Sequence, residues 1–180
     1  MIYEGVITFS IQEQLKNTTL RPPRATEGTA VWTFIRDVGN LDLNSAYCYM
    51  MLCDYFKDTC LIAEADGELV GFVSAFQPPN KPDTLFIWQV AVAASERGKG
   101  LSKAMLDGLI SRIEWEENLF IEATISPSNL ASHALFNGLA KRYDAELGIS
   151  AGYSAQWFPA ESNHEDELLY RVGPIKNTKE

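Results

Sequence analysis

A basic turn with two glycines interrupts the segment Trp88–Met105. It reads Arg97-Gly98-Lys99-Gly100, and it separates an apolar run from an amphipathic one. A strand that passes through glycines into a helix N-terminus presents unpaired backbone N–H groups at the positive end of the helix dipole. Glycine also permits positive φ and lets a ligand approach the backbone closely. The turn therefore predicts a site for an anion such as a pyrophosphate or a 3′-phosphate, with two basic side chains beside it.

Two common phosphate-binding loops do not account for this turn. The loop of nucleotide hydrolases requires the pattern GxxxxGK[ST], which this sequence lacks. A dinucleotide-binding fingerprint requires a third glycine where this chain has Lys103, and it normally follows the first strand of its domain. A strand-to-helix turn that uses glycine only for its geometry stays open as the alternative.

The elements on either side of the turn are predicted from the spacing of apolar residues. Before it, TLFIWQVAVA is apolar at both alternating sets of positions, which predicts a central strand covered on both faces. After it, Leu101, Met105 and Leu109 recur at helical spacing and predict one broad apolar helix face. We expect this helix to end near Glu117.

The remaining segments predict a mixed α/β fold. The other expected elements are, in order, a helix from Thr26 to Gly39, a helix in NSAYCYMMLCDYF capped by Asn44 or Ser45, a hairpin of TCLIAEA and ELVGFVSAF around Asp66-Gly67, a strand LFIEATI, a helix SPSNLASHALFNGLAKRY opened by Ser126-Pro127, and a strand DELLYRV. This order describes a sheet covered by helices. Residues 1–17 are polar and weakly periodic, so we expect a flexible N-terminal arm before a single domain at 18–180.

Composition and charge limit the classes of function. The 180 residues suit one domain of ordinary size, and the formal net charge of −9 argues against a nucleic-acid or anionic membrane surface. We find neither a secretory leader pattern nor an apolar run of roughly 20 residues, which predicts a cytoplasmic protein without an anchor. The three cysteines, Cys48, Cys53 and Cys60, lack the spacing of a zinc or redox site, so we expect reduced structural thiols and no metal.

The segment ERGKGL, followed by a helix, a strand and SPSNLASHALF, resembles the GNAT acetyltransferase family and its acetyl-coenzyme A loop. In the GNAT pattern Q/R-x-x-G-x-G/A the two glycines keep their places, and Ser95 stands at the first position. The resemblance implies a mixed, mostly antiparallel central sheet of about six or seven strands flanked by helices. It also implies acetyl-CoA as cosubstrate. The residues that it assigns to acetyl-CoA are Val90, Val92, Arg97, Gly98, Lys99, Gly100, Leu101 and Asn129.

A closer resemblance extends over nearly the whole chain. The segments LRPP, LDLNSAYCYM, DTLFIWQVAVA, RGKGLSKAML, TISPSNLASHALF and HEDELLYRV, in this order, are similar to the family of L-2,4-diaminobutyrate acetyltransferases. That family forms N4-acetyl-diaminobutyrate on the route to the osmolyte ectoine. The resemblance implies transfer of acetyl from acetyl-CoA to the 4-amino group of this diamine, by a cytoplasmic homodimer with a role in osmotic stress.

The implied reaction is direct attack by a primary amine on the thioester carbonyl in a ternary complex. An alkylamine with a pKa near ~10 is protonated at neutral pH, so a base or a water chain must first remove a proton. The candidate catalytic groups are Asp42, His164 and Glu167. Each has a structural alternative: a surface-loop carboxylate, a solvated histidine and a strand-edge charge, respectively.

The implied substrate carries two ammonium groups and a carboxylate, and its selective acylation requires that the groups not reacting be anchored. We expect Asp42 and Glu167 to receive ammonium groups. Tyr47 and Trp88 are expected to shape the pocket and to contribute a hydroxyl and a cation-π face. His164 is the candidate proton relay. For the acetyl and pantetheine groups, the backbone of the strand WQVAV is the candidate hydrogen-bond donor.

The group that protonates the leaving thiolate is left open by the sequence. Many GNAT members have a tyrosine on the helix after the Asn-containing turn, whereas here Asn129 is in place and Phe136 stands where the tyrosine would fall. A thiolate with a pKa of roughly 8 to 9 can also depart partly unprotonated or take a proton from water. Tyr49, Tyr143 and Tyr153 remain alternatives. An acetyl-cysteine intermediate is not expected, because no histidine lies near the cysteines in sequence.

Two other functions stay open from the sequence alone. One is a GNAT enzyme for another acceptor, such as a polyamine, an aminoglycoside or a protein N-terminus. The other is a non-catalytic GNAT-like module that binds acyl-CoA as a sensor. Thiol release in the presence of amines distinguishes the enzyme from the sensor.

Overall fold

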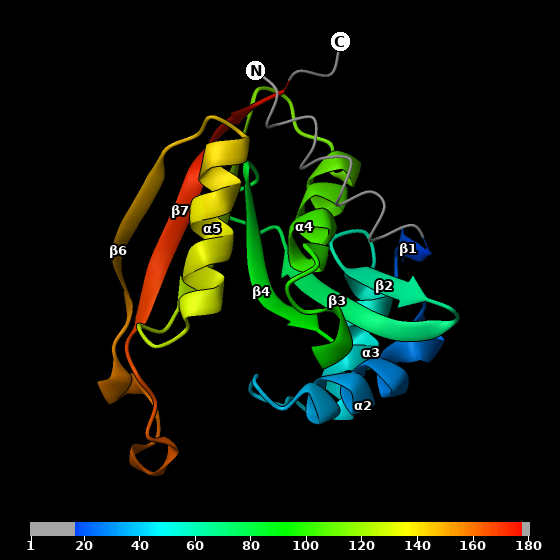
Figure 1. The fold of residues 1–180 in the computed structure, drawn as a ribbon. Helices are drawn as coiled ribbons and strands as arrows, with labels where there is room; N and C mark the ends of the chain where they lie inside the picture. Colours follow the sequence, from blue (N-terminus) through cyan, green and yellow to red (C-terminus); the bar gives the residue numbers. More distant parts are fainter. Residues whose placement is uncertain (1–16, 178–180) are drawn as a thin grey trace. The chain divides into compact units, whose positions relative to one another are not determined.

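The computed structural model describes residues 17–177, and its seven strands follow the order β1-β2-β3-β4-β5-β7-β6 (Figure 1). Strand β4 pairs in parallel with β5, while β1–β2, β2–β3, β5–β7 and β6–β7 are antiparallel, which confirms the expected mixed sheet. The chain divides into two compact units. The first runs to Ala75 and includes Gln89–Ile113, and the second contains Phe76–Trp88 and the residues from Glu114 onward. The N-terminal arm lies outside the described residues apart from its last residue, and the single domain stays a prediction.

The first unit holds the N-terminal elements and the helix after β4. Its elements are β1 (Thr18–Arg21), η1 (Ala25–Glu27), α2 (Gly28–Val38), α3 (Ala46–Tyr55), β2 (Leu61–Ala65), β3 (Glu68–Phe76), the second half of β4 (Thr84–Val92), η2 (Ala94–Glu96) and α4 (Leu101–Arg112). Gly39 ends α2 with φ of +68°, and the Ser45 hydroxyl caps α3 by accepting a hydrogen bond from the Cys48 N–H. The hairpin turns at Asp66-Gly67, where both residues have positive φ. Both predicted helices and the hairpin are confirmed.

The core of the first unit forms where α2 and α3 pack on the sheet. Its buried residues are Val31, Ile35, Tyr49, Leu52, Cys53, Cys60, Ile62, Phe72 and Ala91. The two helices touch closely at Gly28, where a Cβ would lie only 2.6 Å from the Met50 Cα. A larger residue at position 28 would therefore force the helices apart. Figure 1 shows α2 and α3 side by side.

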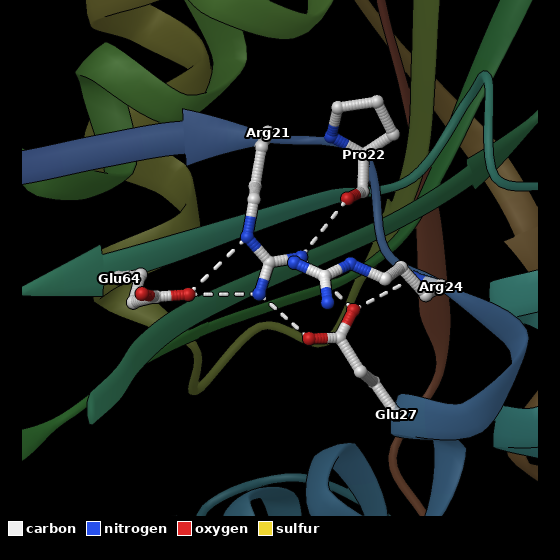
Figure 2. A network of polar contacts seen from close by, with 5 residues as sticks. All are labelled: Arg21, Pro22, Arg24, Glu27 and Glu64. Atoms are coloured by element: carbon white, nitrogen blue, oxygen red, sulfur yellow. Dashed lines mark hydrogen bonds and ion pairs between the residues drawn. The ribbon is translucent and has the colours of Figure 1, made fainter. Parts of the chain in front are cut away.

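An ion network joins β1, η1 and β2 in the first unit (Figure 2). Arg21 donates to both carboxylate oxygens of Glu27, at 2.6 and 2.9 Å, and to Glu64 at 2.8 Å. The Arg24 backbone N–H also donates to Glu27, at 2.7 Å. Hydrogen bonds from Arg21 lower the pKa of Glu27. The network thus holds the chain between β1 and α2 against β2.

We expect Glu27→Gln to lower the free energy of unfolding at pH 7 by about 1.5–3 kcal/mol, the scale of hydrogen bonds to a charged group. The folded pKa of Glu27 lies below its ordinary value of 4.5, so the folded state stabilises the ionised form. This contribution is complete well above pH 4.5 and is lost as the pH falls through the folded pKa. Urea unfolding of both proteins should therefore show a difference that shrinks below pH 4.5. A difference that stays constant with pH, or one that appears equally in the exposed Glu68→Gln control, would contradict this account.

The second unit is built on β5, which pairs with β4 on one side and β7 on the other. Besides the first half of β4, its elements are β5 (Asn118–Ile125), α5 (Leu130–Arg142), β6 (Leu147–Tyr153), η3 (Ala155–Trp157), η4 (Ala160–Ser162) and β7 (Glu167–Lys176). Helix α5 lies beside β7 and buries Phe136 and Leu139 (Figure 1). The register places Glu122 of β5 beside Phe86 of β4 and opposite Arg171 of β7. These three side chains therefore share one face of the sheet.

Two predicted helix boundaries were wrong. Helix α4 ends at Arg112 rather than near Glu117, and Ile113 is already extended. The three glutamates that follow would lie at the negative end of the helix dipole, which disfavours further helix. Helix α5 starts after Asn129, not at Ser126-Pro127, because the Asn129 side chain accepts the Ser132 N–H and forms the cap.

The prediction missed two strands and overstated the cover of a third. Thr18–Arg21 is too short for its period to be seen, and Leu147–Tyr153 contains two glycines, which weaken the strand signal. Strand β4 was expected to be covered on both faces. Its Leu85 face is buried, but Trp88 on the other face is 43% exposed. That face lines a pocket of the second unit.

Candidate active site

The glycine turn connects β4 to α4 through two residues in the left-handed region. Gly98 has φ of +76° and Gly100 has φ of +83°, and Gly100 precedes α4 with no side chain capping the helix. A Cβ at position 98 would meet no heavy atom within 4 Å, so the space beside it is open to a ligand. Arg97 donates to the Val92 carbonyl at 3.3 Å, and the Lys99 ammonium lies 3.1 Å from Glu96. The uncapped helix end suits an anion.

A buried glutamine on β4 holds the segment that carries Asp42. Gln89 is 5% exposed, and its amide nitrogen donates to the Asp42 backbone carbonyl at 2.8 Å. Its carbonyl oxygen accepts from the buried Tyr49 hydroxyl at 3.1 Å. The position of the Asp42 backbone is thereby tied to the strand that leads into the glycine turn. In the sequence Gln89 appeared only as a polar interruption of an apolar run, and that interruption was the available signal.

The other site residues predicted in the first unit lie on exposed or half-buried surface. Tyr47 is on α3 and is 71% exposed, and Asp42 is exposed on the loop before that helix. Val90 and Val92 alternate with the buried Gln89 and Ala91 on β4 and are half-buried. The structure places these residues, together with residues 97–101, in one unit.

The second unit contains a pocket of about 670 Å³ on the face of β4, β5 and β7 that carries Trp88. Its apolar wall includes Phe76 and Phe86, whose ring centroids are 5.2 Å apart, and its polar wall includes Lys81 and Glu122. The sequence prediction did not include these two charged residues. They are 41 residues apart in the chain, and only the tertiary structure brings them together.

The remaining predicted site residues also belong to the second unit. His164 stacks on the Phe158 ring with centroids 3.8 Å apart, and its Nδ1 lies 2.9 Å from the Glu165 carbonyl oxygen. Glu167 is the first residue of β7 and lies opposite Tyr153, which lines the pocket. Asn129 caps α5. Of the residues assigned to the substrate in this unit, Trp88 is the one that lines the pocket directly.

Comparison with known proteins assigns the chain to a family. Residues 31–139 match the model of the acetyltransferase (GNAT) family. The L-2,4-diaminobutyric acid acetyltransferase of Virgibacillus pantothenticus is 51% identical over 154 residues, which cover 86% of this chain and 96% of that protein. The chain belongs to the GNAT family of acetyltransferases. Within this family it belongs with the diaminobutyric acid acetyltransferases, and that of Shouchella clausii is 43% identical over 93% of both chains.

Solved GNAT structures agree with this assignment. The diaminobutyrate acetyltransferase EctA from Paenibacillus lautus, in complex with its substrate L-2,4-diaminobutyric acid and coenzyme A, matches with a TM-score of 0.85 and 52% identity. The match covers 89% of this chain and 96% of that one. The ribosomal-protein-S18-alanine N-acetyltransferase from Escherichia coli, at 16% identity and a TM-score of 0.63, shares the GNAT fold.

The cysteines of this GNAT enzyme are poor nucleophiles. Burial raises the pKa of Cys53 to about 11 and that of Cys60 to about 12. Burial also raises the pKa of Cys48. The thiolate is the nucleophilic form, so these groups are almost wholly unreactive at neutral pH. Transfer through an acetyl-cysteine is therefore disfavoured.

We expect Cys53→Ala and Cys60→Ala each to retain the kcat of the wild type, with a modest loss of stability from the small cavity. Mass spectrometry of the wild type after brief mixing with acetyl-CoA alone should show no acetyl adduct on either cysteine. An adduct that forms and then disappears on addition of the amine, or a variant that binds acetyl-CoA but has lost all turnover, would establish a covalent route.

The structure also locates the tyrosines considered for the leaving group. Tyr49 is fully buried with its hydroxyl on Gln89, Tyr143 ends α5, and Tyr153 is 53% exposed and lines the pocket. Phe136 packs edge-on against Tyr170 in the core of its unit. Tyr153 is thus the one of the three considered that is both exposed and beside a cavity.

Neither a metal site nor a membrane span is found in the part of the chain that the structure describes. Between residues 17 and 177, His, Cys, Asp and Glu side chains do not gather in groups of three that would suit a metal ion. Over the same residues, the helices lack the combination of length and apolar composition needed to cross a bilayer.

Proposed function

We propose that this enzyme transfers the acetyl group of acetyl-CoA to the 4-amino group of L-2,4-diaminobutyrate, giving N4-acetyl-L-2,4-diaminobutyrate for ectoine synthesis. The observation that carries this proposal is the match, at 52% identity over 89% of the chain, to a structure that contains this diamine and coenzyme A. The uncapped glycine turn before α4 supports the cofactor half of the reaction.

Acetyl-CoA binds along β4 and at the start of α4. The pyrophosphate or 3′-phosphate is held by backbone N–H groups around Gly98, Gly100 and Leu101, with Arg97 and Lys99 as nearby positive charges. Backbone groups of Val90 and Val92 contact the pantetheine and the acetyl carbonyl, where they stabilise the negative charge that develops on the oxygen. Asn129 contributes at the start of α5.

The amine reacts directly with the thioester. Asp42 and Glu167 receive ammonium groups of the diamine, and Trp88 offers a ring face to a cation. Tyr47 adds a hydroxyl, and its exposed position on α3 leaves it accessible to substrate. His164, oriented by its stacking on Phe158, relays the proton that the amine loses.

The thiolate of coenzyme A leaves as the tetrahedral intermediate collapses. A thiol pKa of roughly 8 to 9 allows departure without full protonation. Because Phe136 supplies no proton, the donor is water or Tyr153, whose exposure and place in the pocket favour it over Tyr49.

The deciding experiment mixes the purified protein with acetyl-CoA and L-2,4-diaminobutyrate, follows free thiol with a thiol-trapping dye, and identifies the acetylated nitrogen by NMR. Rapid thiol release with acetyl on the 4-amino group is the expected result. Release only with other amines would assign a different acceptor to the same fold. Binding of acetyl-CoA without release by any amine would indicate a sensor module.

We further propose that the enzyme is a cytoplasmic homodimer that acts in the response to osmotic stress without nucleic-acid or membrane partners. The formal net charge of −9 supports the absence of these two partners, because both carry negative charge. Light scattering after size exclusion should give twice the mass of one chain. A monomer mass at micromolar concentration would contradict the assembly.

A further inference from the structure

Glu122 is a buried carboxylate between two cations in the pocket of the second unit. Its exposed fraction is 3%, and the Lys81 ammonium lies 3.1 Å from each of its two oxygens. The Arg171 guanidinium contacts the same carboxylate from the neighbouring strand β7. A buried carboxylate requires such partners, because burying a charge without a counter-charge is strongly unfavourable.

Arg171 is fixed in place by more than this ion pair. Its guanidinium lies over the Phe120 ring, 3.8 Å from the centroid, and approaches the Thr84 hydroxyl oxygen at 3.4 Å. Arg171 is therefore held on the strand and neutralises Glu122 whether or not a ligand is present. Lys81 is the more exposed cation, on the loop before β4, with a side chain 43% exposed against 34% for Arg171.

The cluster carries one negative and two positive charges, so one positive charge is left over on the pocket wall. The nearest further carboxylate in the network is Asp83, which accepts from the Thr84 hydroxyl and is exposed to solvent outside the pocket lining. An ammonium group has three N–H donors, and the two oxygens of Glu122 engage two of them. Lys81 therefore retains the capacity to bind one more acceptor from the pocket.

We propose that Lys81, oriented by Glu122 and Arg171, binds the carboxylate of the diamino acid. This inference rests on the proposed function. There, Asp42 and Glu167 receive the ammonium groups of the diamine, and no cation is assigned to the substrate carboxylate. Trp88 lines the same pocket as Lys81. A diamine bound beside the Trp88 ring therefore lies in the cavity that carries the surplus positive charge. Lys81 thereby selects an amino acid over a diamine that lacks the carboxylate.

The test compares L-2,4-diaminobutyrate with 1,3-diaminopropane, which is the same molecule without the carboxylate. In Lys81→Met, kcat/KM for L-2,4-diaminobutyrate should fall about 10- to 100-fold, the scale of one charge-assisted hydrogen bond, while that for 1,3-diaminopropane stays unchanged. Lys81→Arg should retain most of the selectivity because it keeps the charge. The fold is expected to survive Lys81→Met, because Arg171 still pairs with Glu122, and thermal unfolding checks this.

Lys141→Met, at an exposed position in the last turn of α5, is the matched control and should leave both acceptors unaffected. If Lys81→Met lowers kcat/KM equally for both diamines, or for neither, Lys81 does not bind the carboxylate. Thiol release by the wild type would still support the proposed function in that case. Calorimetric binding of both compounds in the presence of coenzyme A gives a second readout that does not need turnover. Tighter binding of the amino acid, lost in Lys81→Met, supports the inference even if the wild type releases no thiol; equal binding contradicts it.

Discussion

Gly98→Val will lose most of its affinity for acetyl-CoA while remaining folded. Position 98 has φ of +76°, and an added Cβ meets no heavy atom within 4 Å, so the new side chain occupies the volume assigned to the phosphates. The left-handed conformation itself costs roughly 1–2 kcal/mol for a residue with a Cβ. Loss of a single hydrogen bond to a charged phosphate, worth about 1.5–3 kcal/mol, weakens binding by at least about tenfold. Isothermal titration with coenzyme A measures the change.

Gly67→Val is the matched control for the backbone strain. Gly67 turns the β2–β3 hairpin with φ of +81°, and a Cβ there also meets nothing within 4 Å. Both variants should therefore lose similar stability in thermal unfolding, and only Gly98→Val should lose cofactor affinity. Equal cofactor affinity in the two variants would mean that the turn uses glycine for geometry alone and binds no phosphate.

Asp42→Asn will raise the KM for L-2,4-diaminobutyrate about 10- to 100-fold and leave the affinity for acetyl-CoA unchanged. The hydrogen bond between Gln89 and residue 42 is made by the backbone carbonyl, so it persists in the variant and the loop keeps its position. Only the charge of the side chain is removed. A charge-assisted bond to an ammonium is worth about 1.5–3 kcal/mol, which sets the expected range.

Asp54 is exposed on α3, the helix that follows the loop of Asp42. Asp54→Asn therefore provides the control for a general change in surface charge. Its KM should match the wild type. If Asp42→Asn and Asp54→Asn have the same KM, Asp42 does not bind the amine. If Asp42→Asn instead lowers kcat with an unchanged KM, the carboxylate acts in proton transfer rather than in binding, because it then affects only the transition state.

Local features were readable from the sequence because local chemistry determines them. The stop of α2 at Gly39, the cap at Ser45 and the Asp66-Gly67 hairpin each depend on residues within a few positions of one another. The glycine turn belongs to the same class, since its φ values and the helix start that it exposes are properties of one short segment. The six ordered segments that resemble the diaminobutyrate acetyltransferases also predicted the reaction and its substrate.

Strands without a strong pattern of their own needed the tertiary structure. Strand β1 has four residues, and β6 forms because β7 offers it a pairing edge. Their strand character comes from the partner strand rather than from intrinsic preference, which is weak for such sequences. Trp88 was expected at the substrate, but only the structure showed that its face of β4 is open and that Lys81 and Glu122 line the same pocket.

The sequence by itself determined the family and the glycine turn before α4, and it predicted the candidate residues for the amine. Only the tertiary structure decided which residues hold the candidate residues in place and which charged side chains meet. Gln89 binds the Asp42 carbonyl, 47 residues away in the chain. Glu122 contacts Lys81 and Arg171, which are 41 and 49 residues away. Strand register sets the Glu122–Arg171 pair, because a shift of one residue in β7 would turn Arg171 to the opposite face. Such register depends on the packing of whole strands, which no short segment encodes.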